Sequence, residues 1–489
     1  NQPLIVNLLF LVLSINLSHY LYLHSDRLGQ FFKQKWGAVL IEELLFFFFF
    51  SFLILVRGHN PRIEGLEKFM DAGFMASYLR SPLLPAPDMW LAGEKINYYT
   101  FGHFMGAIMT QYWNVDLEYS YNLLLGLIMG LVSIETASLV LNLAQIHNRT
   151  DKKKPISAKE LMKPAIVGGL LLVLIGNGHT SWSYFKNRNT FTGYWYPDAT
   201  RFIENTIHEF PAYSFIVSDL HAHVWAMPLV LTIMLGIFLW IDELVVQSKG
   251  SGFFSILAKR LMAKMQKHQL PKLSDCFSQL KRFILQILGR RLKKNRSQII
   301  RIPKYLGWAI FTGSLLGVAI CTSTWDFLVY SLLLVILSVV SFFLKRAELS
   351  DIIISAFVMI GAALLAALPW LVNFVSISEG VGVVTKASPL WQLLVLWAPH
   401  LVISLTALSL IVWVISRRGS INSSQLLIVA LVATSILLLL IPEFVYVKDI
   451  YPNHPRANTM FKLTFQAFVM MTVVASWLCA SVSQAWVKR

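Results

Sequence analysis

Long apolar stretches, separated by polar segments, make up most of the chain. Apolar runs of roughly 18 or more residues are typical of helices that cross a bilayer. The pattern therefore predicts an all-α fold, a polytopic transmembrane helix bundle of about 11 spans that forms a single membrane unit. The predicted spans are residues 4–23, 38–56, 120–142, 163–177, 222–241, 306–321, 327–344, 351–371, 391–415, 425–441 and 459–482.

Two shorter segments predict helices that do not cross the membrane. Residues 102–113 are apolar but too short to span a bilayer, which predicts an interfacial or re-entrant helix. From Glu67 to Arg80 the chain has no proline, and a proline-rich segment follows. This predicts a short helix on which Glu67 and Asp71, four residues apart, share a face.

The distribution of charge predicts the orientation of the bundle. A hydrophobic content of 56% excludes a soluble domain of this length, whereas a net charge of +16 would also fit nucleic-acid binding. However, residues 244–305 contain fifteen Lys and Arg and one acid, and smaller basic clusters lie at 152–163, 417–418 and 488–489. These segments occupy alternate loops, so the positive-inside rule places them in the cytoplasm. We expect anionic lipid, and no nucleic acid, as the partner of the 244–305 loop.

The remaining loops are then external, and they contain the unusual polar motifs. Gathering ionisable residues at one membrane face is typical of a membrane enzyme that works at that interface. These external loops are residues 57–101, 178–221, 322–326, 372–390 and 442–458.

The first external loop contains two carboxylates and a tyrosine motif. Glu67 and Asp71 could act as a general base or as metal ligands, and the nearby apolar phase would raise the pKa of a base. The alternative is a solvated interfacial helix with Glu67–Lys68 and Asp71–Arg80 ion pairs. The motif NYYTFGH adds a polar group whose tyrosines could instead form an interfacial aromatic belt: Asn97, Tyr98, Tyr99 and His103.

The second external loop is dense in histidine and carboxylate. Such a density suits a divalent metal or proton transfer. A structural role is the alternative, with Asp219 as a helix N-cap. The spacing matches no standard zinc motif, and the three cysteines lie too far apart to suggest one. The candidate residues are His208, Glu209, Asp219, His221 and His223.

Further polar residues lie in the later external loops. Arg456 and Lys462 flank the start of the last span, where cations suit a lipid phosphate, or else snorkel to ordinary headgroups. Trp325 and Asp326 occupy a tight turn between two spans, where an ionisable residue is functional by default.

The order of these motifs resembles that of the YYY-domain membrane proteins of bacteria and archaea. The motifs are EKFMD, NYYTFGH, IHEFPAYSF, SDLHAH, TSTWDF and RANTMFK, and the resemblance covers about residues 38–480. The chain departs from the family pattern at Phe69, Thr100 and Ala457, which puts the role of the third tyrosine position in doubt.

This resemblance implies a fold and a chemistry. The YYY family is grouped by similarity with the GT-C membrane glycosyltransferases, which implies inverting sugar transfer from a polyprenyl-phosphate donor at the outer face of a plasma membrane. Asp71 is then the first choice for the catalytic acid and Glu67 the second. A divalent metal (Mg or Mn) is implied at His208, Asp219, His221 and His223. Substrate contacts are implied for Arg80, Asn97, Tyr98, Tyr99, His103, Glu209, Trp325, Asp326, Lys386, Asp449, Arg456, Asn458 and Lys462.

Two other functions compete with an enzyme. A transporter or flippase of a lipid-linked or anionic substrate would place ionisable residues near the bilayer midplane, often in two related halves. Here the spans are poor in charge and no repeat is evident. A non-catalytic subunit of an envelope complex would instead use the basic loop to dock a cytoplasmic partner.

Overall fold

The structure is a computed structural model of the chain. It describes residues 14–15, 18, 21–22, 25–149, 158–247, 303–376, 378, 380–449 and 453–487. The long helices are α2 (Ser25–Gly58), α5 (Leu117–Arg149), α6 (Ala158–Leu174), α10 (Ala222–Gln247), α13 (Lys304–Thr322), α14 (Thr324–Phe343), α15 (Leu349–Leu371), α16 (Leu390–Arg418), α17 (Ser423–Phe444) and α18 (Ala457–Val487). The short elements are α3 (Lys68–Arg80), α4 (Phe101–Trp113), α7 (His179–Lys186), α8 (Asp198–Arg201), α9 (Pro211–Val217), β1 (Val381–Val383) and β2 (Val445–Val447).

The prediction of an all-α polytopic membrane protein is confirmed. Among the described residues, nine helices are long and apolar enough to cross a membrane, or ten if α6 and α7, which are bent by 71°, form one broken span. These match ten of the predicted spans, with the bent pair at 163–177. The predicted span 4–23 and the basic loop 244–305 lie largely outside the described residues. Segment 102–113 forms the short helix α4, and the helix predicted after Glu67 is α3.

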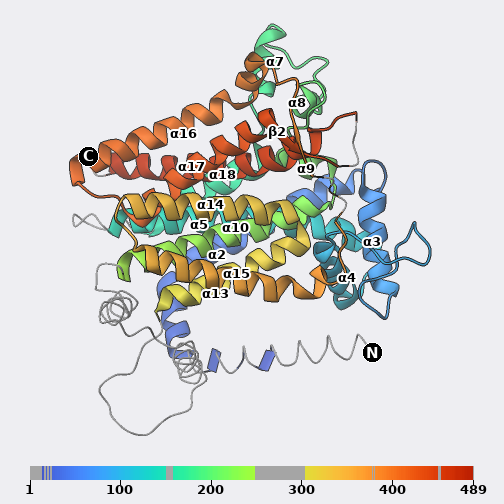
Figure 1. Ribbon diagram of the computed structural model, residues 1–489, viewed down its shortest axis with the longest axis horizontal. Helices are drawn as coiled ribbons and strands as arrows, with labels where there is room; N and C mark the ends of the chain where they lie inside the picture. Colours follow the sequence, from blue (N-terminus) through green and yellow to red (C-terminus); the bar gives the residue numbers. More distant parts are fainter. Residues whose placement is uncertain are drawn as a thin grey trace, which may run out of the picture.

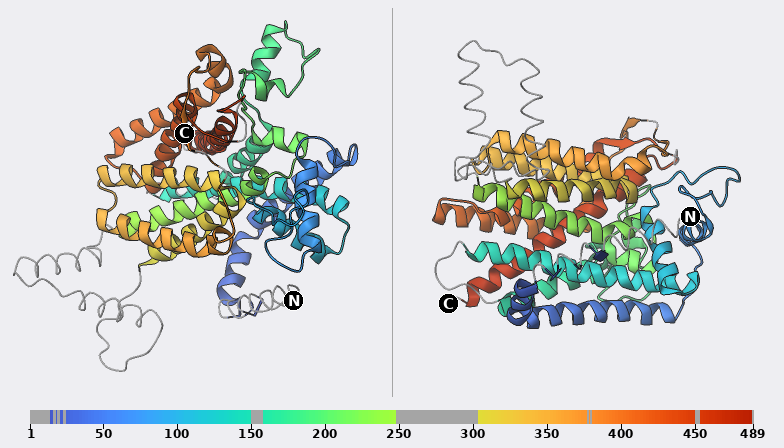
Figure 2. Two further views of the ribbon diagram at one scale, coloured as in Figure 1. Left: turned by 45° about the vertical axis from the view of Figure 1, so that its right-hand side comes forward. Right: turned by 90° about the horizontal axis from the view of Figure 1, so that it is seen from below.

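The short elements gather at one end of the bundle. The long helices run side by side, and α3, α4, α7, α8, α9 and β2 lie together where these helices begin or end (Figure 1). Two further views, one turned about the vertical axis and one from below, show the same segregation (Figure 2). We call this the loop end. It contains every motif predicted to be external, because each long helix reverses the direction of the one before it.

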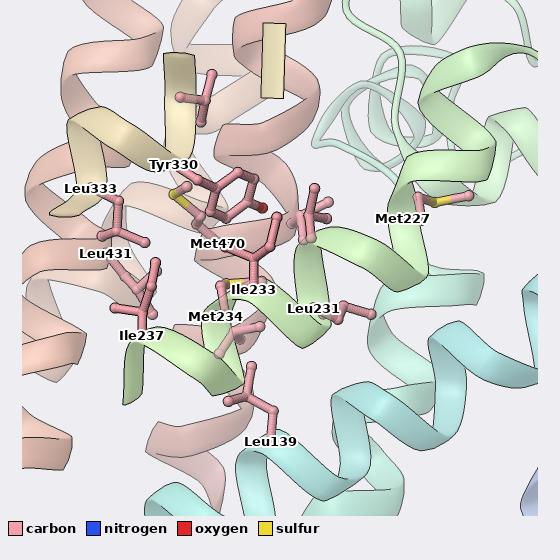
Figure 3. Close-up of a cluster of buried hydrophobic side chains, with 14 of the residues drawn as sticks. Leu139, Met227, Leu231, Ile233, Met234, Ile237, Tyr330, Leu333, Leu431 and Met470 are labelled. Atoms are coloured by element: carbon pink, nitrogen blue, oxygen red, sulfur yellow. The ribbon is translucent and has the colours of Figure 1, made fainter. Parts of the chain in front are cut away.

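The core of the bundle is built around α18 and α10. In α18, 83% of the apolar stretch that could cross the membrane is buried inside the protein. In α2 only 11% of this stretch is buried, so α2 lies at the periphery. Figure 3 shows residues of α10 meeting Tyr330 and Leu333 of α14, Leu431 of α17 and Met470 of α18. Burial of such side chains against one another, together with close helix packing, is what holds helices together within a membrane.

Glycine allows α13 and α15 to pack closely. A Cβ atom at Gly313 would lie 2.4 Å from the carbonyl oxygen of Met359, and one at Gly317 would lie 2.4 Å from that of Ala363. Small residues at such positions are typical of helix contacts inside membranes. This contact fixes the wall on which an apolar pocket at the loop end is built.

A two-stranded ribbon ties together two loops that are distant in the sequence. Strands β1 and β2 pair antiparallel with the register Val381↔Val447, Gly382↔Tyr446 and Val383↔Val445. The ribbon holds the loop after α15 against the loop before α18, so the residues of both loops lie at one side of the loop end.

Candidate functional site

Two carboxylates and two histidines meet at the loop end. His221 Nδ1 lies 2.8 Å from Glu67 Oε2 and 3.7 Å from Asp71 Oδ1. His103 Nε2 lies 2.8 Å from the same oxygen, Asp71 Oδ1. We call Glu67, Asp71, His103 and His221 the carboxylate–histidine cluster. It joins two predicted carboxylates to one histidine from each of two other predicted motifs.

Three local features assemble this cluster. Glu67 is the residue before α3 and Asp71 lies in its first turn, so both side chains leave α3 on one face. His221 immediately precedes α10. Helix α4 can press against α10 because Gly102 and Gly106 leave room for Trp225, whose ring atoms would lie within 2.4 and 2.8 Å of a Cβ atom there. That contact places His103, one residue after Gly102, beside Asp71.

The side chains of Glu67, Asp71 and His221 shift one another's pKa values. Burial would lower the pKa of His221, but its contacts with Asp71 and Glu67 raise that pKa to about 10. Burial would likewise raise the pKa of Asp71, yet the contacts with His103 and His221 hold it below its ordinary value. The contact with His221 also lowers the pKa of Glu67. At neutral pH the cluster therefore holds a protonated His221 between two ionised carboxylates.

The carboxylates of Glu67 and Asp71 differ in their exposure to solvent. The side chain of Glu67 is 48% exposed, whereas those of Asp71 and His103 are fully buried. Glu67 is therefore accessible to a group that approaches from solvent, whereas Asp71 is enclosed. Asp71 is suited instead to fixing the orientation of both imidazole rings.

A third carboxylate, Asp219, stays neutral beside the cluster. Burial, followed by the negative charge of Asp71, raises the pKa of Asp219 to about 9. It is not the N-cap of a helix, because α10 begins at Ala222. Among the described residues, Asp219 Oδ1 has no hydrogen-bond partner.

We expect Asp219→Asn to stabilise the protein increasingly as the pH rises. A folded-state pKa raised above the ordinary 3.8 means that stability is present below 3.8 and is lost as the pH climbs toward 9. Asparagine cannot ionise, so the melting temperatures of variant and parent should agree near pH 4 and diverge by pH 8.5. Tryptophan fluorescence melts would measure this, with the exposed Asp116→Asn as control. A difference that does not change with pH would contradict the assignment.

Tyr98 connects the cluster to an apolar pocket. Its hydroxyl lies 3.1 Å from His221 Nε2, and its ring stacks on Tyr99 at 4.0 Å between centroids. Asn97 fixes this turn, because its side-chain amide both donates to Val375 O and accepts from Val375 N, at 2.9 Å each. The other side of Tyr98 faces a pocket of about 350 Å³ between α4, α13 and α15, lined by Phe101, Phe104, Val318, Pro369, Trp370 and Phe374 among others.

Lys462 is a buried cation near the cluster. It is 5% exposed, its ammonium lies 4.4 Å from the centroid of the Phe461 ring, and within the described part of the chain it has no hydrogen-bond partner. Its charge contributes to lowering the pKa of Glu67. One turn further along α18, Gln466 donates to Asp326 Oδ1 at 2.7 Å and accepts from the Tyr330 hydroxyl at 2.9 Å. Asp326 is thus held by α18, in a network that supports the helix carrying Lys462.

Arg456 has a different environment from the one predicted. It donates to Glu443 Oε2 at 2.8 Å and to the Ser388 hydroxyl at 3.0 Å, and the Arg456–Glu443 pair is buried. The fork that was predicted to bind a lipid phosphate is therefore engaged by a carboxylate. Lys386, also predicted to bind substrate, is exposed and pairs with Glu204 at 4.0 Å.

Four other predicted substrate contacts are spread over the loop end. Asn458 donates to Asp449 Oδ2 at 2.9 Å. Trp325 packs partly buried against the core. Arg80 is exposed at the end of α3, and the ion pair expected between it and Asp71 is absent from the described residues, because Asp71 faces inward to the histidines.

The four predicted metal ligands are not gathered into one site: the rings of His221 and His223 lie 5.5 Å apart between centroids, whereas His208 packs elsewhere, beside Trp397. His223 lies inside the first turn of α10 and faces Phe461, Phe465 and the Ser214 hydroxyl. His208 is buried beside Trp397, and burial followed by the charges of two arginines lowers its pKa to about 3. Glu209, which follows it, pairs with Arg201 at 2.9 Å. Within the described ranges, no group of three His, Cys, Asp or Glu side chains has a geometry that could hold a metal ion.

Two contacts of the site were not predicted from the sequence. The partner of Arg456, Glu443, lies at the end of an apolar helix, where nothing distinguishes it from an ordinary flanking charge. The pairing of His103 with Asp71 depends on α4 packing on α10, and the spacing of Gly102 and Gly106 was the available hint.

Comparison with known proteins gives a family but no activity. Residues 2–414 and 401–471 match the model of a family described as uncharacterized membrane protein (DUF2298). No curated protein and no solved structure matches the chain. The match covers nearly the whole chain and agrees with the multi-pass architecture.

Proposed function

Because the chain belongs to this family of uncharacterized membrane proteins, we propose a function from its own site: inverting transfer of a sugar from a polyprenyl-phosphate donor to an acceptor hydroxyl. The likeness to YYY-domain proteins and to GT-C glycosyltransferases is part of this proposal. So is the location in a bacterial or archaeal plasma membrane, which the likeness implies, with the site at the outer face, which the basic residues of the opposite loops support.

One observation carries the proposal: an accessible carboxylate held by a buried imidazolium. In the transfer, the acceptor oxygen attacks the anomeric carbon while Glu67 takes the hydroxyl proton. The bond between that carbon and the donor phosphate oxygen breaks, and polyprenyl phosphate leaves with the electron pair. A single base suffices, in contrast to the paired carboxylates of a retaining glycosidase. Exposure favours Glu67 over Asp71 for this role.

The other parts of the site fit the two ends of such a donor. A departing phosphate gains negative charge and needs electrostatic stabilisation. The ammonium of Lys462, which has no hydrogen-bond partner among the described residues, would supply it. The pocket beside Tyr98 is mainly apolar and lies between α4 and the lipid-facing helix α15, so it would take the first part of the isoprenoid chain. Tyr98 contacts His221 of the cluster and also lines this pocket.

We expect Lys462→Met to separate stability from ligand binding. Removing a buried charge that lacks a partner should leave the melting temperature unchanged or raise it. Loss of a charge-assisted contact should weaken polyprenyl-phosphate binding by about 10- to 100-fold. Binding to purified protein in nanodiscs measures this, with the exposed Lys448→Met as control. Equal affinities of parent and Lys462→Met would remove Lys462 from the phosphate site.

The function itself can be tested in nanodiscs with radiolabelled polyprenyl-phosphate sugars and a panel of hydroxyl acceptors. The expected result is a labelled product with inverted anomeric configuration and release of polyprenyl phosphate. Transport of a lipid-linked substrate is the second candidate, and one observation favours it: Glu135, inside the α5 span, interacts with the Thr232 hydroxyl of α10. Movement of the labelled donor across vesicle membranes without product formation would support transport instead.

A further inference from the structure

A buried arginine lies at the loop end outside the carboxylate–histidine cluster. Arg57, near the end of α2, is only 6% exposed. Its Nε donates to Asn122 Oδ1 at 2.7 Å and its Nη2 donates to Arg62 O at 3.0 Å. Asn122 is itself fixed, since its amide donates to Pro61 O and Glu118 O. Snorkelling to bulk water does not explain this guanidinium, because it is enclosed and held in place by two acceptors.

Arg57 has no acidic partner in the part of the chain that the structure describes. None of the ion pairs within 4.0 Å includes it, and the two groups that it binds, an amide and a backbone carbonyl, are neutral. A buried charge is costly unless an opposite charge compensates it. The remaining nitrogen, Nη1, makes no hydrogen bond among the described residues and is free to bind an anion.

A second buried cation lies close by. Lys68, the first residue of α3, is 9% exposed, and its ammonium donates to Glu64 O at 3.2 Å. Burial, followed by the like charge of Arg57, lowers the pKa of Lys68, although Asp219 and Glu64 offset part of this effect. Two neighbouring cations that hold only neutral oxygens would both gain from a bound anion.

A cavity of about 550 Å³ opens beside Arg57. Its polar lining comes from Arg57, Arg62, Asn122 and Glu118, and its apolar lining includes Ile54, Ile63, Tyr119 and Leu123. Glu118 faces it as well, and Glu64 lies 3.8 Å from Arg62, so two acids lie near the two arginines of the lining, while Lys68 adds a positive charge close to Arg57 but outside the lining. Helix α2 is the most peripheral of the described spans, which places the cavity against the surrounding lipid.

We propose that this cavity binds a phosphate group, and that in the membrane this is the phosphodiester of a phospholipid headgroup. Arg57 and Arg62 donate to the phosphate oxygens, since guanidinium groups match phosphate geometry. Ile54 and Leu123 contact the glycerol and the upper part of the acyl chains. This site does not depend on sugar transfer, because its lining shares no residue with the carboxylate–histidine cluster. A bound headgroup would, however, fix the segment 61–68 that leads into Glu67.

The test uses the full chain in detergent, with short-chain phosphatidylglycerol and inorganic phosphate as separate probes. We expect phosphatidylglycerol to raise the melting temperature in a saturable way, and inorganic phosphate at the same concentration to have little effect. Arg62→Gln, whose parent side chain is 74% exposed and therefore replaceable without unfolding, should weaken lipid binding about tenfold. The exposed Lys95→Gln is the matched control.

Each contrary outcome has a definite meaning. Equal shifts with inorganic phosphate would identify a free anion and overturn the headgroup assignment. Binding that Arg62→Gln leaves unchanged would overturn the site itself. Native mass spectrometry of Arg57→Gln adds an independent readout, because the variant should lose the co-purifying phospholipid that the parent and Lys95→Gln retain. Retention by all three would place that lipid elsewhere.

Discussion

Replacing Glu67 with glutamine is expected to lower the turnover of sugar transfer by about 10²–10⁴-fold. Glutamine keeps the size of the side chain and can still accept a hydrogen bond from His221, but it cannot take a proton from the acceptor hydroxyl. The donor should bind with nearly unchanged affinity, since the side chain is expected to contact the acceptor and not the phosphate. The loss should therefore appear in kcat, as measured in nanodiscs with labelled donor.

The control for this experiment is Glu94→Gln, an exposed carboxylate of the same loop that lies outside the cluster. The pH profile supplies a second readout. His221 lowers the pKa of Glu67 below its ordinary 4.5, so the base stays ionised and the parent should lose no activity between pH 7 and pH 5 from its protonation. Wild-type turnover by both Glu67→Gln and Asp71→Asn would show that neither carboxylate is the base.

The helices could be predicted from the sequence because their signal is local. Whether an apolar run is long enough to cross a bilayer does not depend on what surrounds it. The basic loops, which alternate along the chain, then indicate which helix ends share a side of the membrane. The broken span at α6 and α7 was the least regular case, since α6 ends at Leu174 and the chain bends by 71° into the short, more polar helix α7 that begins at His179.

For the site, the sequence predicts which residues take part but not which of them contact one another. The residue types that gather at the loop end were recognisable, but their pairing depends on distant contacts. His221 meets Glu67 and Asp71 only after α4 packs against both α3 and α10, and Ser388 meets Glu443 and Arg456 only after β1 and β2 align two loops. The four predicted metal ligands illustrate the limit, because His223, although its ring lies 5.5 Å from that of His221, packs against Phe461 and Phe465.

Asp71→Asn is expected to be the most destabilising single change in the cluster. Asp71 is fully buried and lies between two imidazole rings, so its neutralisation leaves the buried His221 charge with Glu67 alone. Loss of one partner of a buried ion pair typically costs about 3–5 kcal/mol. Thermal unfolding in detergent, followed by tryptophan fluorescence, measures the loss, with Glu94→Gln as a surface control.

The pH dependence of this loss distinguishes an ion pair from simple packing. His221 has a pKa raised from 6.5 to about 10, so its contribution is complete below pH 6.5 and is lost as the pH rises toward 10. Asp71 has a lowered pKa, so its contribution is complete above its ordinary 3.8 and is lost in stronger acid. The difference in melting temperature between Asp71→Asn and the parent should therefore be largest between about pH 4 and 6.5 and shrink by pH 9. A constant difference across this range would mean that the carboxylate acts through shape and hydrogen bonding alone, and that His221 is neutral in the folded protein.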